Sequence, residues 1–243
     1  MPFDRTIPFN ALPSLPPDID LEQPALLKQA IQCTRCLGEL KGLTRTMPNP
    51  AILINSIVLQ ESQASSEIEN IVTTQDKLFQ AFASPNEKMD PQTKEVLRYR
   101  EAIWAGYHSI QNKSLITTNL LIELSQIIRE VKEGIRKVPG TTISRTGGTV
   151  IYTPPEGEGI IRDKLADLEK FINVDDDGLD PLIKMALIHY QFEAIHPFSD
   201  GNGRTGRILN VLYLLLKGYL DLPVLYLSRM ITPKPLSAIC ARS

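Results

Sequence analysis

The sequence predicts an all-α domain that carries a single β-hairpin. Over most of the chain, apolar residues recur every three or four positions, which is the spacing of one face of a helix. Segments also begin with a capping residue followed by Pro, as at Asn49–Pro50, Asp90–Pro91 and Asp180–Pro181, and this favours a helix start. Residues 139–159 differ, because Thr, Ile, Val and Tyr are frequent there and Gly147–Gly148 separates two β-prone runs.

Helices account for most of the remaining chain, and we expect six to eight of them. The Pro-rich residues 1–20 come first and predict an extended arm, because Pro lacks a backbone N–H and biases its predecessor away from helix. The helical segments that follow are residues 21–45, 49–82, 90–111, 114–134, 160–173, 181–195 and the apolar run after residue 207.

Composition is ordinary for a globular domain. Of 243 residues, 42% are hydrophobic and 22% are charged, and this length can bury a sizeable core. The net charge is −2, from 26 basic and 28 acidic residues, so we expect no nucleic-acid partner. Asn210, Lys217 and Asp221 interrupt the longest apolar stretch, which predicts a buried helix and no membrane span. Residues 1–20 lack the apolar core of a signal peptide, so we expect a cytoplasmic location.

Cys33 and Cys36 form a lone C-x-x-C motif on a predicted helix. A zinc site needs two further ligands nearby and a redox site needs a preceding strand, and neither is visible. Positions i and i+3 share a helix face, so we interpret the two cysteines as small residues on a packing face.

The segment HPFSDGNGRTGR, residues 196–207, interrupts two helical segments with residues that favour anion binding. Gly201 and Gly203 permit a tight turn and leave backbone N–H groups unobstructed at a helix start, where partial positive charge attracts anions. Arg204 and Arg207 are three residues apart, so both can reach the same anion.

The same segment supplies two further chemical groups. Asp200 is a hard oxygen ligand, suited to Mg²⁺ that is also held by phosphates. His196 is a general base at the other end of the loop. The segment therefore predicts a site for a magnesium nucleotide, with a base aimed at a phosphorus atom.

Two other interpretations of the glycines remain open. Residues 201–206 match G-x-G-x-x-G, with Asp221 about twenty residues later, as in a dinucleotide-binding fold. That fingerprint requires a preceding strand, whereas residues 181–194 predict a helix. A simple glycine turn with arginines in surface ion pairs explains the glycines, but it does not explain why His196 and Asp200 converge on them.

Residues 196–207 resemble the Fic family signature, H-x-F-x-[DE]-G-N-G-R-x-x-R, at every defined position. Residues 15–70 also resemble the N-terminal region of this family, and residues 146–173 resemble its flap and the following helix. The resemblance covers about residues 10–230 and implies a Fic-type helical domain with one β-hairpin flap. The implied division is an arm over 1–20, a helical region over 21–90 that carries an inhibitory helix, a catalytic core over 91–230 and a short tail over 231–243.

The resemblance implies transfer of AMP from ATP to a Tyr, Thr or Ser hydroxyl of a target protein, including the enzyme itself. His196 would deprotonate the hydroxyl, and Asp200 would hold Mg²⁺ between the α- and β-phosphates. The ATP-binding positions implied by the signature are Gly201, Asn202, Gly203, Arg204, Thr205, Gly206 and Arg207. Of these, Asn202 and the Gly201 and Gly203 peptides would stabilise the α-phosphate, Arg204 the β side and Arg207 the γ-phosphate.

The resemblance also implies that the hairpin docks the target. Its second strand, with Thr149, Val150, Ile151 and Tyr152, would pair with the target's backbone as an added strand. The expected partners are ATP and a target protein, with a homodimer left open.

Ser66 and Glu69 have the spacing of a capping box, which is sufficient to explain both residues locally. However, Ser65-x-x-x-Glu69-Asn70 resembles the inhibitory helix motif of the family. That resemblance implies that Glu69 pairs with Arg207, and we favour this interpretation over a purely structural cap.

Two alternative functions stay open. One is the reverse reaction, removal of AMP from a modified protein, with Glu69 orienting water. The other is a catalytically silent regulatory or toxin-partner module that only binds nucleotide. The presence of His196 argues against a catalytically silent module. Residues 232–243 argue for one, because they lack the tyrosines that contribute to the family's adenine pocket.

Overall fold

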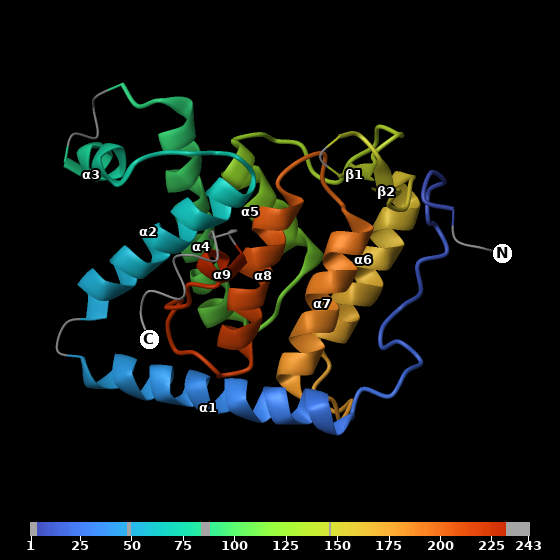
Figure 1. Ribbon diagram of the computed structural model, residues 1–243, viewed down its shortest axis with the longest axis horizontal. Coiled ribbons are helices and arrows are strands. Elements are labelled where there is room, and N and C mark those ends of the chain that lie inside the picture. The colour runs from blue at the N-terminus through green and yellow to red at the C-terminus, as the bar shows by residue number, and fades with distance from the viewer. Residues whose placement is uncertain (1–3, 48–49, 84–87, 146, 232–243) are drawn as a thin grey trace.

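The computed structural model describes residues 4–47, 50–83, 88–145 and 147–231. In these ranges it forms nine helices and one antiparallel hairpin (Figure 1). The strands are β1 Ile143–Ser144 and β2 Val150–Tyr152. This confirms the predicted all-α fold with one hairpin. The helices are α1 Pro24–Thr46, α2 Pro50–Ile68, α3 Gln75–Ala83, α4 Pro91–Lys113, α5 Thr118–Arg129, α6 Glu158–Asn173, α7 Pro181–Ile195, α8 Asn202–Leu216 and α9 Ser228–Ile231.

The extent of two helices differs from the prediction. Residues 49–82 form α2 and α3 instead of one stretch, because Asn70 adopts a left-handed conformation with φ of 61°. Helix α5 ends at Arg129 instead of near Gly134, because Glu130 also turns left-handed. The split at Asn70 and the short α9 explain why the described residues contain more than the six to eight helices expected. Of the expected tail, only residue 231 lies inside the described ranges.

Carboxylates cap two of the Pro-led helices, as the sequence predicts. The Asp90 side chain accepts the N–H of Thr93 at 3.0 Å, and Asp180 accepts the N–H of Leu182 at 2.8 Å. Each bond satisfies a donor that a helix start leaves unpaired. Asn49, the expected cap of α2, lies outside the described residues.

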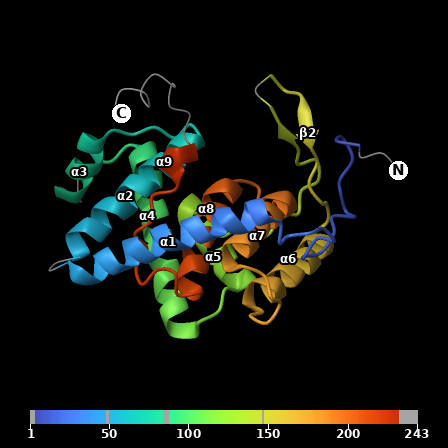
Figure 2. The same cartoon turned by 60° about the horizontal axis from the view of Figure 1, so that its bottom comes forward.

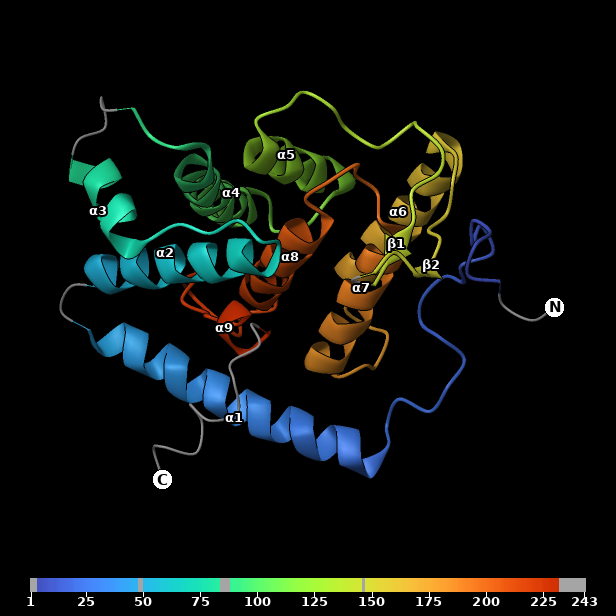
Figure 3. The ribbon, with the colours of Figure 1, turned by 45° about the horizontal axis from the view of Figure 1, so that its top comes forward.

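Helix α8 lies inside the bundle and contacts α2, α4, α5 and α7 (Figure 3). Three of its apolar side chains, Ile208, Leu209 and Leu212, are fully buried. Gly106 lets α4 approach closely, because a Cβ atom there would lie 2.7 Å from a methyl carbon of Leu212. The start of α8, which carries the second half of the signature, is therefore fixed to the hydrophobic core.

The N-terminal arm is bound to the domain along the base of the hairpin (Figure 2). The Phe9 N–H donates to the Thr153 carbonyl at 3.0 Å, directly after β2. Farther along, the Gln191 amide of α7 donates to the Pro13 carbonyl at 2.8 Å. These bonds place the arm beside β2 and α7.

The cysteine interpretation was wrong. Cys33 and Cys36 are both exposed on α1, so they do not lie on a packing face. Among the described residues, no cluster of three or more His, Cys, Asp or Glu side chains could hold a metal ion. No helix within those same ranges has the length and apolar character needed to cross a membrane.

Candidate active site

The loop between α7 and α8 turns at two left-handed residues. His196 ends α7 with φ of 50°, and Gly201 precedes α8 with φ of 78°. A non-glycine residue seldom adopts this conformation, so the surroundings must hold His196 in place. Arg136 does so, because its Nε donates to the His196 carbonyl at 2.7 Å and its backbone N–H donates to Pro197 at 2.9 Å.

The imidazole of His196 suits a base. Burial lowers its pKa below the ordinary histidine value, although the Glu193 backbone opposes the shift. Its Nδ1 is buried and has no hydrogen-bond partner among the described residues. The ring is therefore held in its neutral form near neutral pH, the form that can accept a proton.

Asn202 closes the loop from inside. Its side-chain oxygen accepts the Phe198 N–H at 2.9 Å, and its amide nitrogen donates to the Phe198 carbonyl at 2.8 Å. Phe198 is fully buried against Phe192 and so anchors the loop to the core. These two bonds engage both polar atoms of the Asn202 amide, so the side chain shapes the loop. The amide nitrogen carries a second N–H, and the expected contact of Asn202 with the α-phosphate stays a prediction.

Replacing Asn202 with alanine should destabilise the protein. Because it leaves a buried N–H and a buried carbonyl unpaired, at roughly 1–3 kcal/mol each, we expect the free energy of unfolding to fall by about 2 kcal/mol or more. Urea unfolding of Asn202→Ala checks this, with the exposed Asn112→Ala as the matched control. Equal stability of the two variants would contradict the assigned role.

The first turn of α8 forms the expected anion cradle only in part. Helix α8 has no side-chain cap at Gly201, which suits an anion site, but the Gly201 N–H itself donates to Asp200 Oδ1. Thr205 is fully buried and donates its hydroxyl to the Gly201 carbonyl at 2.9 Å. Gly206 packs under α7, where a Cβ atom would lie 2.4 Å from Glu193 Oε1. Thr205 and Gly206 therefore support the helix and do not face the cradle.

Arg207 is bound by the end of α2. Its Nε donates to the Ser65 hydroxyl at 2.7 Å, and its Nη2 donates to the Ser65 carbonyl and to Glu69 Oε1, both at 2.9 Å. Gly203 makes room for this pair, because a Cβ atom there would lie 2.5 Å from Glu69 Oε1. The expected pairing of Glu69 with Arg207 is present in the structure.

The capping-box interpretation of Ser66 and Glu69 was wrong, because both lie at the C-terminal end of α2. The Ile71 N–H donates to the Ser66 carbonyl and the Asn70 N–H donates to the Glu67 carbonyl, both at 3.0 Å. With Asn70 in the left-handed conformation, this is a Schellman motif whose C-cap residue is Glu69. The motif ends the helix, so the Glu69 carboxylate projects from a fixed terminus toward Arg207.

Arg204 has a different protein partner from Arg207, and the expectation that both arginines reach one anion stays a prediction. The Arg204 guanidinium is 1% exposed and bonds to Glu95 of α4 through Nη1. Its Nη2 lies 3.5 Å from Asp200 Oδ2. Glu95 is one of the residues that sequence reasoning missed, because nothing near position 95 signals a partner more than one hundred residues away.

Asp200 has a carboxylate that fits a magnesium ligand. Its side chain is 68% exposed beside the start of α8, while its Oδ1 accepts the Gly201 N–H at 2.7 Å. Arg129 of α5 lies on the other side, with Nε 3.9 Å from Oδ2. One accessible carboxylate suits Mg²⁺ when phosphates supply further ligands.

Two acids near the arginines were also missed, the buried Glu61 and the half-buried Glu193. Glu61 of α2 accepts the Ser228 N–H at 3.0 Å and the Ser228 hydroxyl, and burial raises its pKa. Burial raises the pKa of Glu193 to about 7, and its Oε1 has no hydrogen-bond partner in the described part of the chain. The spacing of Glu61, Ser65 and Glu69 every four residues could have indicated one helix face.

The hairpin is attached beside His196. The Tyr152 hydroxyl donates to the Ala194 carbonyl of α7 at 2.9 Å, two residues before the histidine. A cavity of about 520 Å³ lies between the hairpin, the arm and α7, and Ile151, Tyr152, Phe9 and Glu193 contribute to its lining. Thr149 is exposed and the side chains of Val150, Ile151 and Tyr152 are half-buried.

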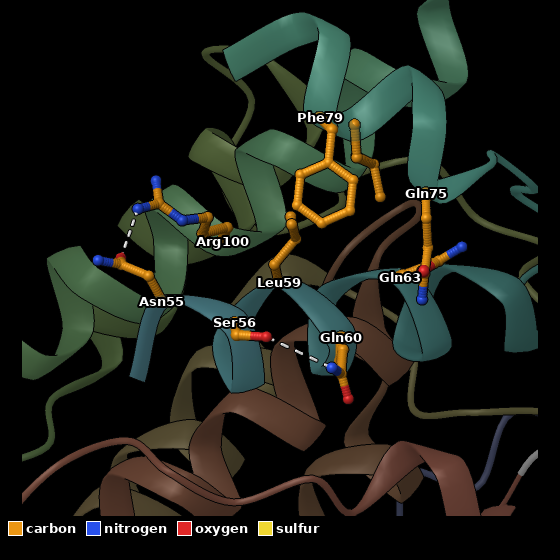
Figure 4. A pocket seen from close by; sticks show the side chains of 9 residues that line it. Asn55, Ser56, Leu59, Gln60, Gln63, Gln75, Phe79 and Arg100 are labelled. Carbon is orange, nitrogen blue, oxygen red and sulfur yellow. Dashed lines mark hydrogen bonds between the residues drawn. The ribbon is translucent and has the colours of Figure 1, made fainter. Parts of the chain in front are cut away.

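Another cavity, of about 550 Å³, lies between α2, α3 and α4 (Figure 4). Leu59 and Phe79 line its apolar part, and Arg100 bonds to Asn55 at 2.7 Å on one side. No residue of the 196–207 segment lines it. This cavity is therefore separate from the histidine and arginine site.

The fold and the site together define an all-α domain in which a glycine- and arginine-rich turn starts a buried helix, one loop after a histidine that ends the preceding helix. Models of two parts of one family match the chain: "Fic/DOC family N-terminal" over residues 27–108 and "Fic/DOC family" over residues 115–214. The chain belongs to the Fic/DOC family.

Individual relatives agree with this assignment. "Protein adenylyltransferase Fic" of Culex quinquefasciatus is 34% identical over 112 residues, which are 44% of this chain and 22% of the relative. The protein of the same name in Drosophila grimshawi is 31% identical over 144 residues, or 53% of this chain and 30% of the relative. The matches thus span less than a third of these curated relatives. A crystal structure of a Fic domain containing signaling protein from Bacteroides thetaiotaomicron has a TM-score of 0.62 at 20% identity, covering 79% of this chain and 73% of the other, and supports the fold.

Proposed function

We propose that this chain is a protein adenylyltransferase that Glu69 holds in an inhibited state. The observation that carries the proposal is the binding of Arg207 by Ser65 and Glu69 directly beside the α8 cradle. An arginine so bound is unavailable to the γ-phosphate of ATP. The position of His196 at the end of α7, one loop before α8, supports the proposal, because both the expected base and the expected phosphate-binding residues lie at this loop.

In the proposed reaction, a target hydroxyl attacks the α-phosphorus of ATP. His196 takes the hydroxyl proton as the new oxygen–phosphorus bond forms. The bond from the α-phosphorus to the bridging oxygen breaks, and pyrophosphate leaves. The α8 donors stabilise charge on the transferring group, with Arg204 on the β side and Arg207 on the γ-phosphate once Glu69 has moved.

Asp200 would hold Mg²⁺ between the α- and β-phosphates, and the ion would supply charge neutralisation for the leaving pyrophosphate. The exposed carboxylate beside the cradle supports this assignment.

The hairpin is the proposed docking site of the target. A target segment added along Thr149 to Tyr152 would reach His196, because the Tyr152 hydroxyl ties this strand to α7 at Ala194. This mode uses backbone pairing, so it admits segments of varied sequence. A homodimer remains a prediction, and so does a cytoplasmic location.

The same site geometry admits removal of AMP, with the Glu69 carboxylate orienting a water molecule. The exposed position of Glu69 supports this second candidate, because its side chain is 40% exposed and reachable by water. A catalytically silent module is less favoured, because a binder of nucleotide does not need the buried, neutral imidazole of His196.

Labelled ATP distinguishes these functions. The protein is incubated with magnesium and ATP that carries the label on either the α- or the γ-phosphate. Adenylyl transfer predicts that protein retains the α-label and not the γ-label, and mass spectrometry then locates AMP on a Tyr, Thr or Ser residue. Release of AMP from premodified protein supports the reverse reaction. ATP binding without either activity in wild type and Glu69→Gly contradicts both enzyme proposals.

A further inference from the structure

Five charged side chains of alternating sign are linked by successive ion pairs near the start of α8. In order they are Glu95, Arg204, Asp200, Arg129 and Glu133. Three of them, Glu95 of α4, Arg129 of α5 and Glu133 after α5, come from outside the 196–207 segment. The Asp200 carboxylate thus lies between two arginines, and each arginine also pairs with a glutamate.

The two arginines stop short of Asp200. Arg204 Nη2 lies 3.5 Å and Arg129 Nε 3.9 Å from Oδ2, beyond the length of a good charge-assisted hydrogen bond. Arg204 bonds instead to Glu95, and Arg129 lies 3.6 Å from Glu133. Asp200 Oδ2 is therefore near both cations without being bonded to either.

The two glutamates are not equivalent. Glu95 is 28% exposed and its partner Arg204 is 1% exposed, so this pair lies largely out of water. Glu133 is 72% exposed, and solvent screens its attraction for Arg129. Of the two glutamates, Glu95 therefore has the stronger effect on the position of the arginine next to Asp200.

We propose that Glu95 is a positioning residue that draws Arg204 away from Asp200 and so leaves the carboxylate available to Mg²⁺. The inference rests on the proposed function and deepens it. A buried guanidinium needs a counterion, because leaving it unpaired is costly. Without the charge of Glu95, Arg204 has Asp200 as its remaining ion-pair partner in the described part of the chain, and it would close on Oδ2. A carboxylate engaged by arginine competes poorly for a divalent cation.

The test separates a magnesium effect from a general loss of structure. The parent protein carries Glu69→Gly and His196→Ala, so that Arg207 is free and no turnover occurs. Calorimetry measures its ATP affinity in magnesium and in EDTA, and the ratio of the two affinities is the magnesium gain. Adding Glu95→Gln should reduce this gain by about tenfold or more, since residues that orient a metal ligand typically affect affinity to that degree. ATP affinity in EDTA should be unchanged or tighter, because Arg204 keeps its charge.

Three further variants make the result decisive. Glu101→Gln removes an exposed carboxylate from the same helix and should leave the gain intact. Glu95→Asp keeps the charge and should recover part of the gain, which covers the case in which Glu95→Gln does not fold. Asp200→Asn should remove the gain, and adding Glu95→Gln to it should cause no further loss.

Equal weakening by Glu95→Gln in magnesium and in EDTA would overturn the inference, because a merely structural role moves both affinities together. An unchanged gain would overturn it as well. If the parent itself binds no ATP in either solution, the adenylyltransferase proposal fails, and the role of Glu95 fails with it. If the parent shows the magnesium gain and the Glu95→Gln variant keeps it, the positioning role of Glu95 is wrong, while the adenylyltransferase proposal stands.

Discussion

Replacing Glu69 with glycine is expected to raise self-modification by α-labelled ATP about a hundredfold. In the structure, Glu69 holds Arg207 at 2.9 Å, so ATP that enters cannot place its γ-phosphate on that arginine. Misplacement of a reacting atom by about 1 Å can cost around a hundredfold in rate. The effect should therefore appear in turnover more than in ATP affinity. Transfer of the α-label to protein, at saturating ATP and magnesium, measures it.

Glu67→Gly is the matched control for this variant. Glu67 lies in the last turn of the same helix and is exposed, so its replacement adds the same glycine flexibility and leaves Arg207 bound. Glu69→Gly with an activity no higher than that of wild type, in a protein that remains folded and binds ATP, would refute the inhibitory role. Lower activity would point instead to Glu69 as a purely structural cap.

Replacing His196 with alanine in the Glu69→Gly protein is expected to reduce transfer by about a hundredfold or more, in line with the loss of a general base. ATP affinity by calorimetry should stay near that of the Glu69→Gly protein, because the phosphates bind to the α8 start and the arginines. Arg204→Ala should behave differently from His196→Ala. It should weaken ATP binding itself, since a charge-assisted hydrogen bond contributes roughly 1.5–3 kcal/mol.

The pH profile provides an independent check on the base. Burial lowers the pKa of His196, so the ring is neutral at pH 7 and becomes charged only at lower pH. Transfer by Glu69→Gly should therefore be level near neutral pH and stay level through about pH 6.5, the ordinary histidine pKa, before falling at lower pH. Equal transfer with and without the His196 side chain would exclude it as the base.

The helices and the loop chemistry were predictable because their causes are local. Apolar spacing and the carboxylate caps Asp90 and Asp180 act within a few residues, and both caps form as predicted. The breaks at Asn70 and Glu130 were missed, because a non-glycine residue in the left-handed conformation has no clear sequence signal.

The roles of individual loop residues were harder to predict from the sequence. A sequence shows that Asn202 is polar, but not that two bonds to Phe198 occupy its amide. Similarly, the Ser66 and Glu69 spacing fits either end of a helix until the chain direction at Asn70 is known. The structure places Glu69 at the C-cap of α2, where its backbone ends the helix and its carboxylate bonds to Arg207.

The sequence by itself determined the chemical groups of the site, because histidine, aspartate, glycines and arginines lie within twelve consecutive residues. Only the tertiary structure decided how those groups are paired. Arg207 meets Ser65 and Glu69 across about 140 positions, and Arg204 meets Glu95 across 109. Helix packing sets such contacts, since α2 and α4 pack against α8 and carry these side chains to its first turns. A buried guanidinium then takes the nearest carboxylate, wherever the chain supplies it.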